Sequence, residues 1–537
     1  MKKIVVKFLA LLLISFTNCF AQQNKPNVIL IMTDDMGYSD IGCYGSEIPT
    51  PNIDALAKTG IRFSQFYNTS RCCPTRASLL TGLFQHQAGI GQMSEDPGSL
   101  RIGKDINDWG TPGYQGYLNR HCVTIAEVLK PSGYHTYMTG KWHLGYNDTA
   151  KWPLQRGFDK FYGILAGATS YLKPQGGRGL SRDNERLAPP EGDYYTTDAF
   201  TDNAISYINN QNDKNPFFLY LAYNAPHWPL HAKEDDIALF EGKYMIGWDK
   251  VRKQRYNKQL QSGLIKKKWG FSERDPATRE WDKLSLNEKK GVAHRMAVYA
   301  AQVKCIDDNI GKLITTLKQK DIFDNTLIIF LSDNGACAEM YDELGSMPDS
   351  LINDPDFSDP VSYGIGWANA SNTPFRKWKN RAEEGGIAAP FIMHWPKGIV
   401  QGNRIEHTPA YLIDIMPTIL KITGARYPAV AENGENIYSL TGNSLTPAFA
   451  NKTLDHHEYM YWEHGNNAAI RKGNWKAIHS LTKDTWELYD LSKDRSEMND
   501  VTAQQPEIIK ELKQKWYEWA NVNFVLPKRV DGAKTND

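Results

Sequence analysis

The chain has 537 residues, with 62 Lys and Arg against 61 Asp and Glu, which gives a net charge of +1. A balanced charge gives no reason to expect nucleic acid or an anionic membrane as a partner. The chain is too long for one small core, so we expect one large domain and one smaller one.

Residues 1–21 have the composition of a secretory signal peptide. The basic start MKK precedes the apolar stretch IVVKFLALLLISF, and Cys19 and Ala21 supply small residues before a cleavage site. The apolar run is shorter than the ~20 residues that a membrane span needs. We therefore predict cleavage after Ala21 and a periplasmic or secreted protein without stable membrane insertion. A retained anchor and a lipoprotein cut before Cys19 are the alternatives.

From Asn27 onward, strand-like and helix-like segments alternate. The apolar runs predict strands at 27–32, 135–142, 216–223 and 325–333. The amphipathic segments and their terminating Gly and Pro residues predict helices at 52–60, 123–134, 201–211 and 294–320. This alternation is typical of an α/β sheet covered by helices on both faces.

The pattern changes near residue 424. Short strand-like segments at 458–464, 468–480 and 486–491 precede a terminal helix at 505–521. We therefore predict a large domain over residues 22–424 and a C-terminal subdomain over 425–537, with an antiparallel sheet and a helix packed on it. Within the large domain, the charged stretch 232–292 is typical of a solvated helical insertion. Such an insertion beside a pocket could also shape substrate choice.

Two of the expected strands end in acidic steps. The first strand leads into Asp34 and Asp35, and the last leads into Asp333 and Asn334. In open α/β sheets, ligands bind outside the carboxyl ends of the strands. Four oxygen-bearing side chains at this edge favour Ca²⁺ or Mg²⁺ and disfavour zinc. The alternative is that these residues only cap helices or form turns.

Cysteine usage leaves the redox chemistry open. Scattered cysteines in an oxidising compartment allow up to three disulfides without resembling a disulfide scaffold. Cys72 and Cys73 are poorly placed to pair, because a disulfide needs Cα atoms about 5.5 Å apart with convergent side chains. A zinc site would need CxxC-type pairs or nearby histidines. The pairing stays undetermined for the other cysteines after Ala21, which are Cys43, Cys122, Cys305 and Cys337.

The stretch SRCCPTRASLLTG, residues 70–82, predicts a helix that begins near Pro74, because proline is favoured at the first helical position. Cys72 would then lie just before the helix N-terminus. That end favours anions and lowers the pKa of a cysteine. Arg76 would lie in the first turn and reach the same anion. The local pattern therefore predicts an anion site with a reactive residue in it.

The pattern C-x-P-x-R, followed by a short apolar run and Thr-Gly, resembles the signature of the type I sulfatases of the alkaline phosphatase superfamily. Only Cys72 has proline at +2 and arginine at +4. Cys73 therefore occupies the variable position of the motif, and we expect it to be packed in the core without a catalytic role. The resemblance implies that a formylglycine-generating maturation enzyme converts Cys72 to Cα-formylglycine, whose hydrated aldehyde is the nucleophile. Arg71 and Ala388 depart from what many members carry, and no role rests on Ala388.

The resemblance covers nearly the whole chain after the signal peptide. It implies an α/β fold in which helices sandwich a large alkaline-phosphatase-like mixed sheet, the catalytic domain of residues 22–424. Asp34, Asp35, Asp333 and Asn334 match the family's ligands for one Ca²⁺, with the oxygen of the converted Cys72 as a further ligand.

Further motifs occur in the family's order. TGKWHLG supplies Lys141 and His143, NAPHWPLH supplies His227, and NTPFRKWKNRAEEGG supplies Lys379. Taken singly, each has an ordinary explanation as a surface lysine, a loop histidine or a turn. Their joint occurrence in one order favours the sulfatase reading.

The resemblance also implies a mechanism. Ca²⁺, Arg76, Lys141 and Lys379 would neutralise the sulfate oxygens while one hydroxyl of the hydrate attacks sulfur. His227, helped by Lys379, would protonate the leaving alkoxide. His143 would then take the proton of the second hydroxyl, so that sulfate is eliminated and the aldehyde returns.

The expected substrate is a sulfated carbohydrate, such as a galactose or N-acetylhexosamine sulfate attacked at a chain end. Tyr461, Trp462, Glu463 and His464 have the groups that a sugar ring needs, although an ordinary strand explains them equally. The rival interpretations are a phosphate or phosphonate monoester hydrolase of the same superfamily and a sulfoglycan-binding protein in which Cys72 is never converted.

Overall fold

The computed structural model describes residues 25–94, 108–431 and 434–527. The predicted signal peptide, residues 1–21, lies outside these ranges. Within them, no helix has the length and apolar character that a bilayer crossing requires.

The described residues contain a mixed sheet of eleven strands, which are β1 (Asn27–Thr33), β2 (Ile61–Tyr67), β3 (His135–Lys141), β4 (Lys160–Ile164), β5 (Leu180–Arg182), β6 (Glu185–Arg186), β7 (Phe217–Ala222), β8 (Thr326–Ser332), β9 (Ala388–His394), β10 (Arg404–Glu406) and β11 (Ala410–Tyr411). Their order is β10-β2-β9-β8-β1-β7-β3-β4-β5-β6, and β11 pairs with β2. The strands from β8 to β4 in this order run parallel, whereas β9 is antiparallel to both neighbours. The expected mixed sheet is confirmed.

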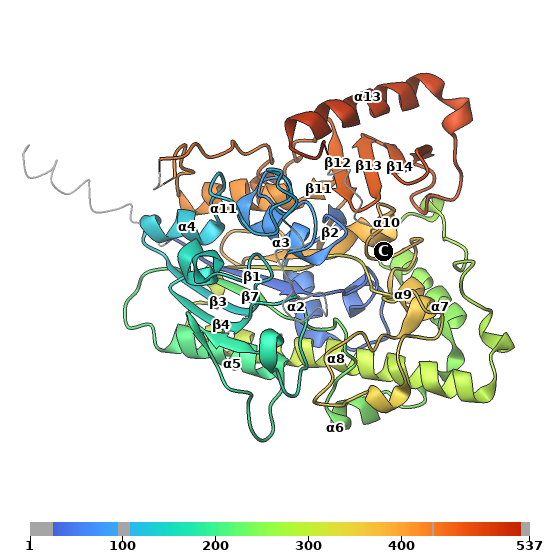
Figure 1. Cartoon of the computed structure of the whole chain (residues 1–537), viewed down its shortest axis with the longest axis horizontal. Helices are drawn as coiled ribbons and strands as arrows, with labels where there is room; N and C mark the ends of the chain where they lie inside the picture. Colours follow the sequence, from blue (N-terminus) through green and yellow to red (C-terminus); the bar gives the residue numbers. More distant parts are fainter. Residues whose placement is uncertain (1–24, 95–107, 432–433, 528–537) are drawn as a thin grey trace, which may run out of the picture.

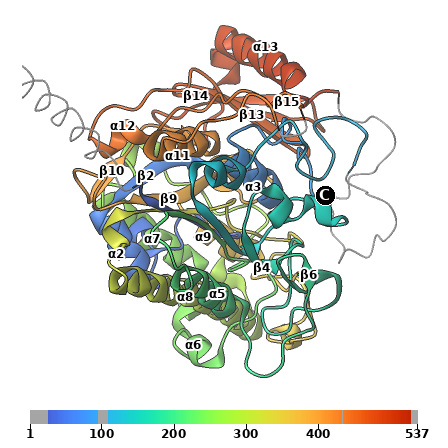
Figure 2. The same ribbon diagram turned by 90° about the vertical axis from the view of Figure 1, so that its left-hand side faces the viewer.

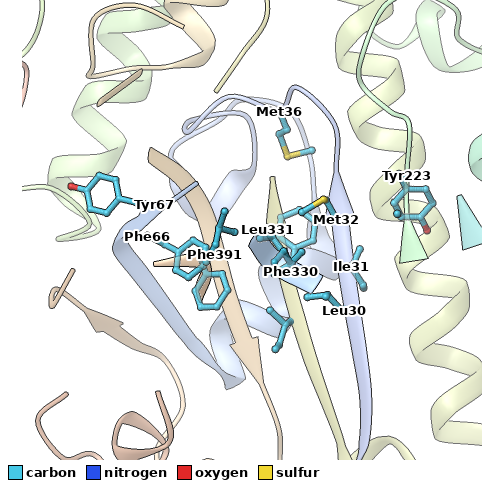
Figure 3. Close-up of a cluster of buried hydrophobic side chains, with 14 of the residues drawn as sticks. Leu30, Ile31, Met32, Met36, Phe66, Tyr67, Tyr223, Phe330, Leu331 and Phe391 are labelled. Carbon is cyan, nitrogen blue, oxygen red and sulfur yellow. The ribbon is translucent and has the colours of Figure 1, made fainter. Parts of the chain in front are cut away.

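The four strands predicted from apolar runs, β1, β3, β7 and β8, are adjacent at the centre of this sheet. All seven residues of β1 are buried, as expected for a parallel strand covered on both faces. Figure 3 shows Leu30, Met32 and Phe330 in the resulting apolar cluster. In the same cluster, the ring of Phe391 on β9 stacks on that of Phe66 on β2, with centroids 3.7 Å apart.

Helices cover both faces of the main sheet (Figures 1 and 2). On one face, α8 (Leu286–Gln319) packs against α2 (Pro51–Thr59) and α5 (Thr196–Asn209). On the other, α3 (Cys72–Thr81) packs against α11 (Ile415–Thr423). Shorter helices are α4 (Ile125–Leu129), α6 (Glu234–Ala238), α9 (Gly364–Ser371), α10 (Glu384–Ile387) and α12 (Thr446–Phe449).

The charged stretch 232–292 is not simply solvated. Its helix α7 (Trp248–Gln261) buries one face. Arg255 on that face is fully buried, and it contacts Asp40 at 2.6 Å and Glu47 at 2.8 Å. The expectation of a solvated insertion is therefore wrong for α7. A buried arginine that is paired with carboxylates looks, in a hydropathy pattern, like an exposed one.

The C-terminal part forms a separate antiparallel sheet of four strands, β12 (Met460–His464), β13 (Asn467–Lys472), β14 (Trp475–Ser480) and β15 (Thr485–Asp490). The helix α13 (Pro506–Val522) packs on this sheet against β13 and β14 (Figure 1). Gly465 and Gly473, with φ of 59° and 57°, begin the two tight turns of the first three strands. The predicted antiparallel sheet and terminal helix are confirmed.

Candidate active site

The predicted site residues converge at the carboxyl edge of the main sheet. Most of these residues follow or end four adjacent parallel strands. Strand β8 leads into Asp333 and Asn334, and its neighbour β1 leads into Asp34 and Asp35. Next in the sheet, β7 leads into His227, and β3 ends at Lys141, two residues before His143. Pairing of Thr33 with Ser332 puts the two acidic steps side by side. Helix α3 and the loop before α10 add the remaining predicted residues, Cys72, Arg76 and Lys379. All ten residues are at most 4% exposed.

One half of the site pairs two cations with two carboxylates. Lys141 Nζ lies 2.6 Å from Asp34 Oδ2, and Arg76 Nη2 lies 2.8 Å from Asp333 Oδ2 and 3.5 Å from Asp34 Oδ2. Arg76 also donates to the backbone carbonyl of Lys141 at 3.0 Å. These contacts hold both cations at the centre of the site.

The other half joins Asp35, Lys379 and His227. Lys379 Nζ lies 2.9 Å from Asp35 Oδ2 and 3.3 Å from His227 Nε2. Burial disfavours the charge on Asp35, but Lys379 and His227 outweigh it and lower the pKa of this carboxyl. Burial also disfavours the charge on Lys379, yet Asp35 raises the pKa of the ammonium well above its usual value.

Cys72 is the first residue of α3, not the residue before it. The N-cap is Arg71, whose carbonyl accepts the first helical hydrogen bond from the Thr75 N–H at 3.0 Å. Pro74 is therefore the third helical residue, and the expectation of Pro74 at the first position is wrong. The first-turn N–H groups have no helical partner in any case, so proline is tolerated there too.

The surroundings of Cys72 favour its ionised form. A hydrogen bond from Cys73 outweighs burial, and the charges of Lys141 and His143 add to it, so that the pKa of Cys72 is well below its usual value. The donor atoms of Cys72, Cys73 and His143 all lie within 4.8 Å of one another. Cys73 itself is fully buried and accepts a hydrogen bond from the Ser94 N–H at 3.1 Å.

The cysteines that follow the predicted cleavage site form no disulfide within the described residues. All six thiols are free, including the four whose pairing the sequence leaves undetermined. Most of these thiols are buried in the core. A disulfide framework therefore does not hold this fold together.

The backbone is unusual at two of the site residues. Asp35 and His143 have φ of 67° and 56°, in the left-handed region that residues other than glycine seldom adopt. A side chain at Gly167 would lie 2.6 Å from His143 Cε1, so only glycine leaves room for this imidazole. A side chain at Gly335 would lie 1.8 Å from the carbonyl oxygen of Gly385. Helix α10, which follows the loop that carries Lys379, therefore packs directly on the residue after Asn334.

The oxygen-bearing residues fit a hard divalent cation. Asp34 Oδ1 and Asn334 Oδ1 are buried and have no hydrogen-bond partner among the described residues. Burial, and next the charge of Asp333, raises the pKa of Asp34 to about 7. A cation held by Asp34, Asp35, Asp333 and Asn334 would satisfy the two unpartnered oxygens and offset the repulsion between carboxylates.

The structure adds residues that the sequence did not indicate. Glu339 bridges Arg71, at 2.5 Å, and the Trp228 indole N–H, at 2.7 Å, and it lies 3.7 Å from Lys379 Nζ. A single glutamate in a loop carries no motif that would have pointed to it.

The suggested sugar-contacting segment 461–464 is packed instead. Trp462 and Glu463 are 2% and 1% exposed. The Trp462 indole N–H donates to the Asn68 carbonyl at 2.9 Å, and Glu463 pairs with His86 at 2.7 Å. The alternative of an ordinary strand, β12, is the correct one.

Comparisons with known proteins agree with this geometry. The family model described as Sulfatase matches residues 26–425, and a model for the C-terminal part of N-sulphoglucosamine sulphohydrolase matches residues 378–521. An uncharacterized sulfatase of Schizosaccharomyces pombe is 36% identical and covers 92% of this chain and 93% of its own. An arylsulfatase of Klebsiella aerogenes is 36% identical and covers 75% and 88%.

Solved structures extend the likeness to the fold. The crystal structure of Ps i-CgsB in complex with k-i-k-neocarrahexaose superposes with a TM-score of 0.66 at 28% identity, over 93% of both chains. By the match of the Sulfatase model over residues 26–425, the chain belongs to the sulfatase family and is a hydrolase of sulfuric esters.

Proposed function

We propose that the protein is an exported sulfatase that uses Cα-formylglycine at position 72 and one Ca²⁺ to hydrolyse sulfate monoesters of carbohydrates such as galactose or N-acetylhexosamine. The observation that carries this proposal is the position of Cys72. It begins α3, interacts with the charges of Arg76 and Lys141, and lies within 4.8 Å of a ring nitrogen of His143.

Asp34, Asp35, Asp333 and Asn334 would hold the Ca²⁺, and the bound ion would supply positive charge for the sulfate oxygens. Arg76 and Lys141 supply further positive charge from buried, hydrogen-bonded positions. Such preorganised charge is usually the largest contribution to catalysis at an anionic centre. These cations also orient the sulfate, because their own contacts to Asp34 and Asp333 hold them in place.

His227 is suited to deliver a proton to the leaving oxygen. Its Nδ1 lies 2.7 Å from the Trp228 carbonyl oxygen, to which it can donate, and this contact orients the ring. Its Nε2 then faces Asp35 at 3.4 Å and Lys379 at 3.3 Å. A proton on Nε2 would therefore be available on the side of the site where a sugar alcohol leaves.

His143 lies close to residue 72. Converted residue 72 would supply a geminal diol, which can release sulfate without attack by water. His143 Nδ1 or Nε2 lies within 4.8 Å of Cys72 Sγ, so it is placed to take a proton from an oxygen at that position. Lys379 would assist by keeping a positive charge next to His227.

The carbohydrate substrate is supported by the relatives. Human N-acetylgalactosamine-6-sulfatase is 26% identical and covers 86% of this chain and 73% of its own length. The neocarrahexaose complex described above points in the same direction. Export, with a maturation enzyme in the same host, rests on the composition of residues 1–21 and on the motif around Cys72.

Mass spectrometry of the tryptic peptide of residues 72–76 tests the proposal on protein from its native host. Conversion of the Cys72 thiol to an aldehyde should remove about 18 Da. Alkylation separates the remaining thiol of Cys73 from the aldehyde, and a Cys73→Ser variant should still convert. Converted protein should release sulfate from a panel of sulfated sugars, and a chelator should stop it. An unmodified Cys72 in active protein would contradict the proposal.

A further inference from the structure

Three residues at one side of the buried site reach solvent. Arg71 and Glu339 have 14% and 15% of their side chains exposed, and Trp228 is also partly exposed. Arg71 precedes Cys72 in the chain, and Trp228 follows His227. We call Arg71, Trp228 and Glu339 the rim. Since the residues inside the rim are buried, a substrate larger than sulfate must extend past some part of the site's border.

The rim lies on the side of the leaving group. Glu339 Oε2 accepts from Trp228 Nε1 at 2.7 Å and lies 3.7 Å from Lys379 Nζ. Lys379 Nζ in turn is 3.3 Å from His227 Nε2. The oxygen that receives a proton from His227 belongs to the leaving group. The rest of that group must therefore lie close to Glu339 and Trp228.

The rim has little net charge to attract a second anion. The positive charge of Arg71 is paired with Glu339 at 2.5 Å, and that of Lys379 with Asp35 at 2.9 Å. Binding of an additional sulfate or carboxylate normally needs an arginine or lysine in excess. An indole, a carboxylate and a guanidinium instead offer an apolar ring surface and hydrogen bonds for hydroxyl groups.

We propose that the rim is the subsite for the sugar ring that carries the sulfate, and that Glu339 makes this subsite select an uncharged ring over a ring with a second acidic group. The proposal rests on the function proposed above and adds the residue that sets the charge preference. Glu339 occupies the Arg71 guanidinium. A second anion on the ring would therefore lose its water without finding a free cation, and this loss opposes its binding.

Calorimetry of the full chain with Cys72→Ala, saturated with Ca²⁺, tests the charge preference without conversion or turnover. The probes are two pairs that differ in the second anionic group: N-acetylglucosamine 6-sulfate with D-glucosamine-2-N,6-O-disulfate, and galactose 6-sulfate with galactose 4,6-disulfate. The pair of sugars with the lower Kd values decides the test. In that pair, the Kd of the disulfate should exceed the Kd of the monosulfate by about tenfold or more. Glu339→Gln should reduce this ratio to about threefold or less.

Glu343→Gln is the matched control. Glu343 lies in the same loop, and its carboxylate pairs with Arg279 at 2.9 Å. It should leave the Kd ratio unchanged. A ratio near one or below one in the parent protein would overturn the proposal, and so would an unchanged ratio in Glu339→Gln or a failure of all four sugars to bind.

The two proposals fail in different ways. If Glu339 only positions Lys379, Glu339→Gln will lower the rate of the converted enzyme but keep the Kd ratio, which contradicts the charge preference alone. If Cys72 is never converted, the mass of the 72–76 peptide shows it, whereas the Kd ratio is unaffected. The ratio in the parent protein needs no variant at Glu339, so the test stands even if that variant does not fold.

Discussion

Two buried clusters of charged side chains differ in whether all their oxygens are hydrogen-bonded. Between the main sheet and the C-terminal sheet, Lys476 Nζ lies 3.1 Å from Glu384 Oε1 and 2.6 Å from Glu497 Oε1. Arg495 Nε lies 2.7 Å from Glu384 Oε2, and the Glu384 N–H donates to Glu497 Oε2 at 2.8 Å. Every carboxylate oxygen of this interface cluster has a partner.

The active-site cluster is not closed in this way. Asp34 Oδ1 and Asn334 Oδ1 have no hydrogen-bond partner in the described part of the chain, and the pKa of Asp34 is raised to about 7. In the interface cluster, Lys476 and Arg495 outweigh burial and lower the pKa of Glu384 to about 2, whereas burial raises the pKa of Glu497 to about 7. A buried charge is stable only when it is paired. The difference teaches that the polar groups of one cluster are satisfied within the fold, whereas the other cluster leaves two buried oxygens without a partner among the described residues.

The largest expected effect is on activity. Asp34→Asn should lower kcat about 10³-fold, because it removes a carboxylate from the proposed cation site and a contact of Lys141 and Arg76. The free energy of unfolding of the calcium-free protein should not fall, because burial and the charge of Asp333 outweigh Lys141 and Arg76 in disfavouring the charge that the substitution removes. Sulfate release and urea unfolding of the same preparation measure both. A variant that keeps its rate, or that loses stability without Ca²⁺, would break the comparison.

Lys476→Met should act on stability. It leaves Glu384 and Glu497 buried without their shared cation, and breaking a buried pair of this kind costs about 3–5 kcal/mol. Urea unfolding measures the loss. Lys472→Met is the control, because Lys472 pairs with Glu511 at a site where both side chains are 40% exposed. That change should cost less than about 1 kcal/mol. Equal losses in the two variants would contradict the assignment of the interface cluster.

Substitutions in the two clusters should differ in how they change the response of the melting temperature to Ca²⁺. A ligand that binds only the folded state at 100 times its Kd stabilises it by about 2.7 kcal/mol. Adding Ca²⁺ to chelator-treated protein should therefore raise the melting temperature, and Asp34→Asn should abolish the shift. Lys476→Met should lower the starting temperature but keep the shift. A shift that survives in Asp34→Asn would place the ion elsewhere.

The smallest expected effect is on the pH dependence of stability. Because the pKa of Asp34 is raised to about 7 from 3.8, the folded protein binds a proton there that the unfolded chain has released above pH 4. The stability that this proton contributes is present below the unfolded pKa and is lost as the pH rises through 7. Calcium-free wild type should therefore lose about 2 kcal/mol more than Asp34→Asn between pH 5 and 7.

The stability profile of Asp34→Asn must be subtracted from that of the wild type, because a carboxyl of the interface cluster titrates in the same pH range. Burial raises the pKa of Glu497 to about 7 as well, although Lys476 opposes it. Glu497 is present in both proteins, so its titration cancels in the difference between them. Parallel pH profiles of unfolding for wild type and Asp34→Asn would show that Asp34 does not titrate in this range.

The sequence by itself determined the centre of the fold and most of the candidate site. Apolar runs identified β1, β3, β7 and β8, because a parallel strand buried on both faces must be apolar along its length. The acidic steps after β1 and β8 then had to meet, since parallel neighbours end at one edge. The motif around Cys72 added the candidate nucleophile.

Only the tertiary structure decided which polar residues are buried and with what partner. Arg255, Glu339 and Glu384 look like ordinary surface residues in the sequence, yet the hydrogen-bond partners of their side chains lie 92 to 317 residues away. Local periodicity reports where apolar side chains face, but an ion pair between distant segments leaves no periodic trace. The rim and the interface cluster therefore became visible only once the chain was folded.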